Sequence, residues 1–111
     1  MTTTTKPLFS PQIVNIAESV LYQVPVSTTT VISYLSLHNT STTPVKITVS
    51  TPVSGELSST ANQLTVKTLA GLETLRVYDA VGYTMATGQS IRAFADTDGA
   101  VNIRAGGAEI T

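Results

Sequence analysis

The side chains that could carry acid–base chemistry are few and scattered. The chain has 111 residues, one histidine (His38) and seven Asp and Glu residues. No serine, cysteine or acidic residue stands at a spacing from His38 that indicates a catalytic triad or dyad. Nothing in the sequence indicates which two carboxylates could form the pair that glycoside hydrolysis requires. We therefore expect a protein that is not an enzyme and has no catalytic residue.

Metal and cofactor sites are not indicated either. The run Asp96-Thr97-Asp98-Gly99 contains the first part of a calcium-binding loop, but it lacks the later ligands and the closing glutamate. A hairpin turn accounts for the same residues. The chain has no cysteine, so disulfides and thiolate ligands are excluded. No glycine stands in the strand–loop–helix context of a phosphate-binding loop. The sequence thus predicts no metal and no cofactor.

Charge is sparse along the chain. Charged residues make up 12 % of it, about half the usual share, and the net charge is −1. The six Lys and Arg residues occur singly, which argues against nucleic acid as a partner. Low charge favours a surface that is covered by a partner or by copies of the same chain, although the many threonines are an alternative source of polarity. No signal peptide or membrane-helix pattern is present, so we expect cytoplasmic synthesis and no membrane partner.

Short alternating segments predict the elements that must position these side chains. Residues 45–50 alternate most clearly, with Val45, Ile47 and Val49 expected in the core. Residues 30–38 predict a central strand, with Val31 and Leu35 on one face and Ile32 on the other. The remaining candidate strands are 12–17, 20–24, 63–68, 73–78 (or one helical turn), 81–86, 90–95 and 100–105. Gly106-Gly107 predicts a bend or bulge, and Asn39-Thr40-Ser41 is interpreted as a turn rather than a glycosylation site.

These segments together predict an all-β fold. We expect a single β-sandwich or jelly-roll-like barrel of about seven to nine short antiparallel strands with an N-terminal arm. The arm comprises residues 1–11 and the sandwich residues 12–111. The strands 90–95 and 100–105 are expected to pair as a hairpin around the turn at 96–99.

The candidate partner-binding residues lie in the arm and on one strand. The arm is rich in threonine and predicts either a strand added to a neighbouring molecule or a frayed terminus. Its candidate residues are Thr4, Thr5, Lys6, Pro7, Leu8 and Phe9. Phe94 is the further candidate, because it stands on the polar face of its strand. Packing under a neighbouring loop is the alternative for Phe94.

The order of the segments resembles that of small structural proteins of tailed-phage virions. The likeness covers roughly residues 17–111. Its parts are Val20-Leu21-Tyr22-Gln23-Val24-Pro25, the strand ending in Asn39-Thr40-Ser41, the Val-rich strand 45–49, Gly88 to Ala95, Ala100 to Ile103, and Glu109-Ile110. The chain departs from the family at Val26-Ser27-Thr28, where Ala-Gly is common. It also departs at Ala70-Gly71-Leu72-Glu73, where the family has a Leu-rich strand with a Gly-Glu turn.

This resemblance implies a function and a location. It implies a non-enzymatic capsid decoration or cement protein in the virion, bound to the major capsid protein or another virion protein. It also implies a homo-oligomer, with a trimer favoured. A neck, fibre or tail accessory protein is the alternative that the resemblance leaves open. A carbohydrate-binding β-sandwich is an alternative from another class, although four Tyr, two Phe and no Trp are few aromatic residues for one.

Overall fold

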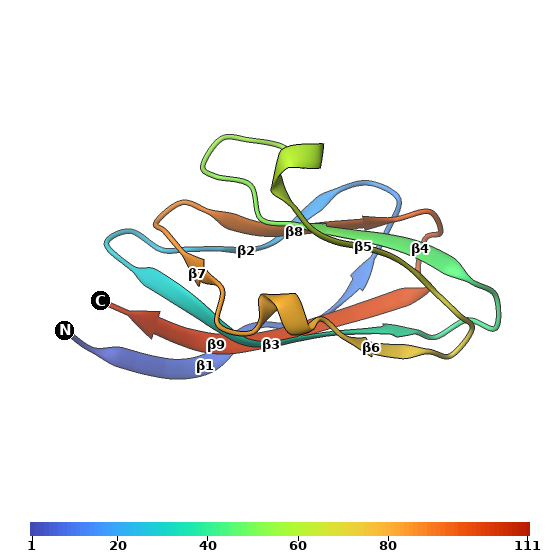
Figure 1. Ribbon diagram of the computed structural model, residues 1–111, viewed down its shortest axis with the longest axis horizontal. Coiled ribbons are helices and arrows are strands. Elements are labelled where there is room, and N and C mark those ends of the chain that lie inside the picture. Colours follow the sequence, from blue (N-terminus) through green and yellow to red (C-terminus); the bar gives the residue numbers. More distant parts are fainter.

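Two antiparallel sheets pack face to face in the computed structural model, which describes all residues 1–111 (Figure 1). Sheet A has the order β1-β9-β3-β6, and β7 also pairs with β3; sheet B has the order β2-β8-β4-β5. The strands of sheet A are β1 (Thr3–Val14), β3 (Thr29–Asn39), β6 (Thr74–Arg76), β7 (Thr84–Met85) and β9 (Val101–Ile110). Those of sheet B are β2 (Ser19–Gln23), β4 (Val45–Ser50), β5 (Gln63–Leu69) and β8 (Ser90–Ala95), and the 3-10 helices are η1 (Thr60–Asn62) and η2 (Tyr78–Ala80). The predicted all-β sandwich is confirmed.

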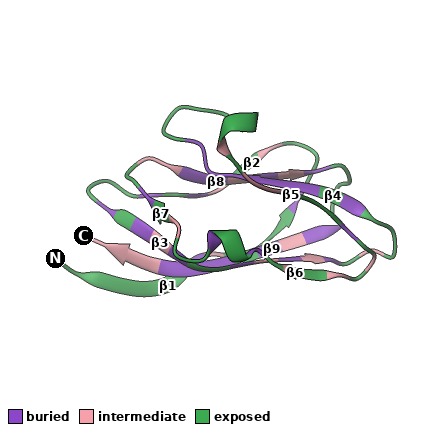
Figure 2. Ribbon diagram, viewed as in Figure 1, coloured by how far each residue is buried: buried purple, intermediate pink, exposed green.

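The core lies between the two sheets and consists of 21 buried hydrophobic residues (Figure 2). Strand β4 follows its predicted alternation, because Val45, Ile47 and Val49 are all fully buried. On its outward side Ser50 is buried as well, since the connection between β4 and β5 folds back over it and Ser58 forms a hydrogen bond with its hydroxyl. The outer face of sheet B is therefore partly covered.

Residues Asp96 to Gly99 connect the two sheets instead of closing a hairpin. Strand β8 pairs with β2 and β4, whereas β9 lies between β1 and β3. The predicted hairpin is therefore wrong. The sequence could not exclude it, because the alternation of both strands fits either sheet. Asp98 Oδ1 accepts a hydrogen bond from the backbone N–H of Ile16 at 2.8 Å, and Asp96 Oδ1 accepts one from that of Lys46 at 3.1 Å. These bonds fasten the connection to β4 and to the segment between β1 and β2.

The first residues of the chain form an edge strand of sheet A rather than a separate arm. Strand β1 runs antiparallel to β9, from Thr3 opposite Ile110 to Val14 opposite Val101. The predicted boundary at residue 11 therefore falls inside a strand, and no new strand begins at Gln12. The physical reason is that β9 of the same chain offers an unpaired edge, and pairing with it costs none of the translational freedom that pairing with a neighbour would cost.

Two β-bulges meet at one point of β9. The register shifts between Ile32 and Tyr34 of β3 and between Pro7 and Phe9 of β1, in both cases beside Gly106. The extra residue in β3 lets Ile32 and the later Leu35 both face the core, where each is fully buried. The predicted opposition of those two side chains is wrong for this reason, although β3 is a central strand as predicted.

The glycine pair in β9 is required by close approach. A Cβ on Gly106 would collide with the ring of Tyr34, and one on Gly107 would collide with the backbone carbonyl of Val31. The predicted irregularity at Gly106-Gly107 is therefore confirmed in position. The extra residues of the bulges, however, belong to the partner strands β1 and β3.

The buried Asn39 organises the turn that follows β3. Its Nδ2 donates to the backbone carbonyl oxygen of Thr43 at 2.8 Å and to those of Leu69 and Ala70 at 3.2 Å. Its Oδ1 accepts a hydrogen bond from the backbone N–H of Ser41 at 3.0 Å. The interpretation of this run as a turn is confirmed, and the same side chain joins that turn to the end of β5.

Candidate interaction surfaces

The structure divides the predicted partner-binding residues between opposite sheets. Leu8 is 7 % exposed and belongs to the core, so its side chain is not free to dock on a neighbour. Phe9 is half-buried and packs against the same core. Thr4, Thr5 and Pro7 are exposed on β1. Phe94 is half-buried on the outer side of sheet B and does not meet the β1 residues.

The outer edge of β1 has free backbone groups over a short stretch. Thr2 and Thr111 exchange both backbone hydrogen bonds. In an antiparallel ladder such pairs alternate along the strands, so the N–H and C=O groups of Thr3 and Thr5 point away from β9. The next position in this series is Pro7, which has no N–H to donate. The edge therefore allows a short strand addition and blocks a long one.

A cleft lies beside β1 on sheet A, and we call it the Tyr34 cleft. Its volume is about 570 Å³, and it is lined by Lys6, Pro7, Leu8, Phe9, Ser10, Pro11, Tyr34 and Arg104. The Tyr34 ring lies against the backbone of Gly106, where a side chain would displace it. Tyr34 is 38 % exposed, so part of its ring remains open to solvent. The cleft thus combines aromatic and proline surface with the guanidinium of Arg104.

A second hollow lies on the outer side of sheet B, and we call it the Phe94 groove. Its volume is about 520 Å³, and it is lined by Ile16, Lys46, Thr48, Gln63, Val66, Phe94, Ala95 and Asp96. Phe94, Thr48 and Val66 form one cross-strand row over β8, β4 and β5. Ile16 is 58 % exposed and Val66 42 % exposed, so the groove presents apolar surface to solvent between polar groups.

An ion pair holds the neighbouring loop against the same sheet. Arg92 Nη1 of β8 lies 2.9 Å from Glu18 Oε2, which also accepts a hydrogen bond from the backbone N–H of Ser58. Burial alone would raise the pKa of Glu18, but the hydrogen bonds from Ser58 and the Arg92 charge outweigh it and lower that pKa below its usual value. Both charges of this pair therefore serve the attachment of the loop.

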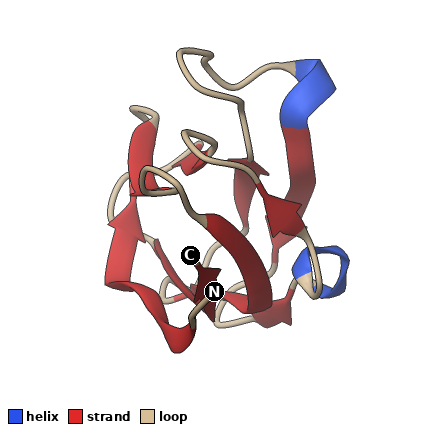
Figure 3. Cartoon of the chain, turned by 90° about the vertical axis from the view of Figure 1, so that its left-hand side faces the viewer, coloured by secondary structure: helices blue, strands red, loops and turns tan.

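The two termini lie side by side at one end of the sandwich (Figure 3). A partly buried polar cluster joins β1, β2, β3 and β9. The hydroxyl of Tyr22 donates to Glu109 Oε2 at 2.6 Å and lies 2.7 Å from Thr30 Oγ1, and Lys6 Nζ lies 3.3 Å from Glu109 Oε1. The hydrogen bond from Tyr22 and the Lys6 charge lower the pKa of Glu109. Burial and the nearby Glu109 raise the pKa of Tyr22 to about 12.

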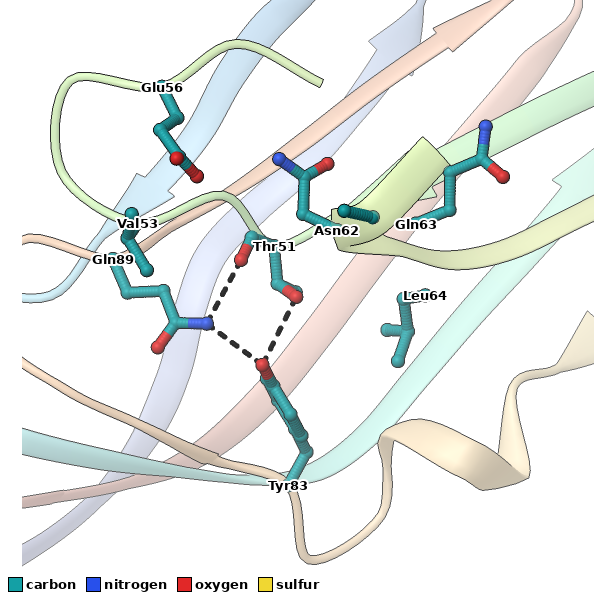
Figure 4. Close-up of a pocket in the computed structure, with 9 residues that line it drawn as sticks. Thr51, Val53, Glu56, Asn62, Gln63, Leu64, Tyr83 and Gln89 are labelled. Atoms are coloured by element: carbon teal, nitrogen blue, oxygen red, sulfur yellow. Dashed lines mark hydrogen bonds between the residues drawn. The ribbon is translucent and has the colours of Figure 1, made fainter. Parts of the chain in front are cut away.

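The pocket in Figure 4, which we call the Tyr83 pocket, has a volume of about 350 Å³ and is lined by Thr51, Val53, Glu56, Ala61, Asn62, Gln63, Leu64, Tyr83 and Gln89. Gln89 Nε2 donates to the hydroxyl of Tyr83 at 2.8 Å and to the carbonyl oxygen of Thr51 at 2.9 Å. Gln89 Oε1 accepts a hydrogen bond from the backbone N–H of Ala86. The amide of Gln89 is thus used within the chain, where it ties the loop after β4 to β8.

The sequence analysis did not predict the polar side-chain contacts described above. Glu18–Arg92, Tyr22–Glu109 and Tyr83–Gln89 are contacts between different strands or loops, and no local pattern signals them. No group of three or more His, Cys, Asp or Glu side chains is placed to hold a metal ion. None of the helices has the length and apolar character needed to cross a membrane.

No protein-family model matches this chain, and neither a curated protein nor a solved structure shows significant similarity to it.

Proposed function

We propose that this protein is a non-enzymatic structural protein of a tailed-phage virion, and specifically a capsid decoration protein. The observation that carries the proposal is the Phe94 groove, and the resemblance in strand order supplies the class of particle. Single apolar residues are common on any surface, but a concave apolar cluster with a polar rim is typical of a surface that another protein covers. The partner is then the major capsid protein.

The Phe94 groove combines an apolar floor with a charged rim, and this combination is suited to a protein partner. Phe94 and Val66 provide an apolar floor on three hydrogen-bonded strands, which is a rigid base for a docking contact. Lys46 and Asp96 on the rim can fix the orientation of a partner segment through opposite charges. A protein that binds only the assembled shell stabilises that shell by mass action.

Self-association of the decoration protein is part of the proposal. The free backbone groups of Thr3 and Thr5 allow two copies to pair along β1 over a few residues. Such pairing joins two copies, because each β1 has one free edge, so the trimer that the resemblance implies and that we propose on the shell uses a second contact as well. Analytical ultracentrifugation measures whether such association occurs in solution. Thr5→Pro removes a free N–H group of this edge, and a Thr5→Pro variant that still forms the same oligomer would exclude the β1 edge as its interface.

The test of the decoration role uses particles that lack the protein. Purified protein is added back, and the temperature at which the shells break is compared with that of bare shells. We expect a higher temperature that saturates at a fixed copy number per shell. Val66→Asp places a charge in the groove and should abolish the effect, whereas Val26→Asp makes the same change at a side chain 80 % exposed outside the groove and should preserve it.

The outcome of the same experiment distinguishes the alternatives. Shells that break at one temperature with and without the protein contradict the decoration role. Saturation at the copy number of one vertex or one tail favours the neck, fibre or tail accessory role. Equal behaviour of Val66→Asp and Val26→Asp would exclude the Phe94 groove as the docking site.

A further inference from the structure

The outer face of sheet A places two arginines in one row. Ser36 of β3 stands opposite Arg76 of β6 on one side and opposite Arg104 of β9 on the other. Directly opposed residues share a face of the sheet, and neighbouring strands lie about 4.8 Å apart, so the two Cα atoms of the arginines are roughly 10 Å apart. Both arginine residues are exposed, and Ser36 lies half-buried between them.

These two arginines have no partner within the chain. The two ion pairs of the protein are Lys6–Glu109 and Arg92–Glu18, so Arg76 and Arg104 are left without a carboxylate within ion-pairing distance. The outward positions of β1, β9, β3 and β6 hold no Asp or Glu, because Glu109 lies on the inward side with Tyr22. The face is therefore cationic although the chain as a whole has a net charge of −1.

A flat apolar surface adjoins this row. Tyr34 stands opposite Gly106, two positions along the ladder from the pair Ser36 and Arg104 and on the same face of the sheet. Its ring lies on the β9 backbone because Gly106 has no side chain, and it lines the Tyr34 cleft together with Arg104. A ligand on this face would thus meet an aromatic ring and a guanidinium side by side.

We propose that this face of sheet A, formed by Arg76, Ser36, Arg104 and Tyr34, binds an acidic saccharide. A pyranose ring has an apolar face that can stack on Tyr34, and its carboxylate or sulfate can accept paired N–H groups from Arg104. Arg76 then meets the acidic group of a following sugar along the row. The site lies on the sheet opposite to the Phe94 groove, so it does not depend on the proposed binding to a capsid.

The test is calorimetric titration of the whole chain with an oligosaccharide of glucuronic acid. A neutral glucose oligosaccharide of the same length and a glutamate peptide of the same charge are the comparison ligands. We expect binding of the acidic saccharide alone. Arg104→Gln and Tyr34→Leu should each weaken that binding about tenfold or more, since each removes a major contact. Lys67→Gln, which removes an exposed cation on sheet B, should leave it unchanged.

Several outcomes would overturn the inference. They are absence of binding to the acidic saccharide, equally strong binding of the glutamate peptide, and equal effects of Lys67→Gln and Arg104→Gln. Circular dichroism melting of each variant establishes that it is folded. If Tyr34→Leu does not fold, the pair Arg104→Gln and Arg76→Gln decides alone, and unchanged affinity in both would reject the site. Failure here leaves the shell-stability experiment unaffected, because Val66 lies on the other sheet.

Discussion

The outer faces of the two sheets use their charged residues in opposite ways. On sheet B, Arg92 is paired with Glu18, and the connection between β4 and β5 covers Ser50. On sheet A, Arg76 and Arg104 are exposed and unpaired, and no loop covers Ser36 to a similar extent. An arginine on a strand of this protein is therefore structural where a loop carries a carboxylate to it. Where no such loop is present, the arginine is available to an external anion.

The Phe94 groove and the Tyr34 cleft also differ in their charged residues. The Phe94 groove has an apolar floor with one cation and one anion on its rim. The Tyr34 cleft has no carboxylate among its lining residues, and of its two cations Lys6 is paired with Glu109 while Arg104 is unpaired. A neutral apolar groove is suited to a protein partner, and a cationic face with an aromatic ring is suited to an acidic saccharide. The two partners that we propose would therefore bind on opposite sides of one sandwich.

The largest expected effect concerns the core that both faces share. Ile47→Ala should lower the free energy of unfolding by about 2–5 kcal/mol, because Ile47 is fully buried between the sheets and the change leaves a cavity. Urea denaturation measures it. Lys46→Ala, one position away and pointing outward, should change stability by no more than about 0.5 kcal/mol. Equal effects of the two variants would contradict the register of β4.

The next largest effect is expected at Gly106 on sheet A. Gly106→Ala should cost about 1–3 kcal/mol, because the new methyl group collides with the Tyr34 ring and forces it from the sheet. In a Tyr34→Ala background the same change should cost clearly less. A double-mutant cycle in urea measures this coupling. Additive costs would show that Tyr34 does not lie on Gly106.

The paired and unpaired arginines can be compared directly. Glu18→Ala should lower stability by about 1–2 kcal/mol, because it removes the acceptor of hydrogen bonds from Arg92 and Ser58 under a partly buried loop. Arg104→Gln should change stability by no more than about 0.5 kcal/mol, since Arg104 is exposed and forms no ion pair. Thermal unfolding of both variants at pH 7 tests the contrast, and a larger loss for Arg104→Gln would reverse it.

The smallest effect is a change in the pH dependence of stability. The pKa values of Glu18 and Glu109 are lowered in the folded state, so their stabilisation is present above the ordinary value of 4.5 and is lost as the pH falls through the folded values. Glu109→Gln should therefore reduce the loss of stability on acidification below that point. Urea midpoints between pH 3 and 6 measure the slope, and an unchanged slope would contradict the shift at Glu109.

At alkaline pH, the stability of the protein should depend on the ionisation of Tyr22, whose pKa is raised rather than lowered. Its pKa is raised from 10.0 to about 12, so its stabilisation is complete below 10 and is lost between those two values. Tyr22→Phe cannot ionise and should lose less stability over that interval than the unmodified protein. Equal losses would show that the hydroxyl of Tyr22 titrates as it does in water.

The amino-acid sequence by itself determined the local strands of this protein. The alternation of Val45, Ile47 and Val49 was sufficient for β4, because side chains point to opposite sides of a strand with period two and one side must leave water. The turn at Asn39 was equally predictable, since an asparagine can bond to the backbone of its own turn. These features depend on residues a few positions apart.

Only the tertiary structure decided which strands became neighbours. The strands β8 and β9 are adjacent in sequence and lie in different sheets, and Lys6 meets Glu109 across 103 positions. The row of Arg76, Ser36 and Arg104 likewise comes from three distant segments. Alternation specifies that a strand has an apolar side but not which strand it pairs with, because backbone hydrogen bonds are the same for every partner. That choice sets the composition of the two faces for which binding is proposed.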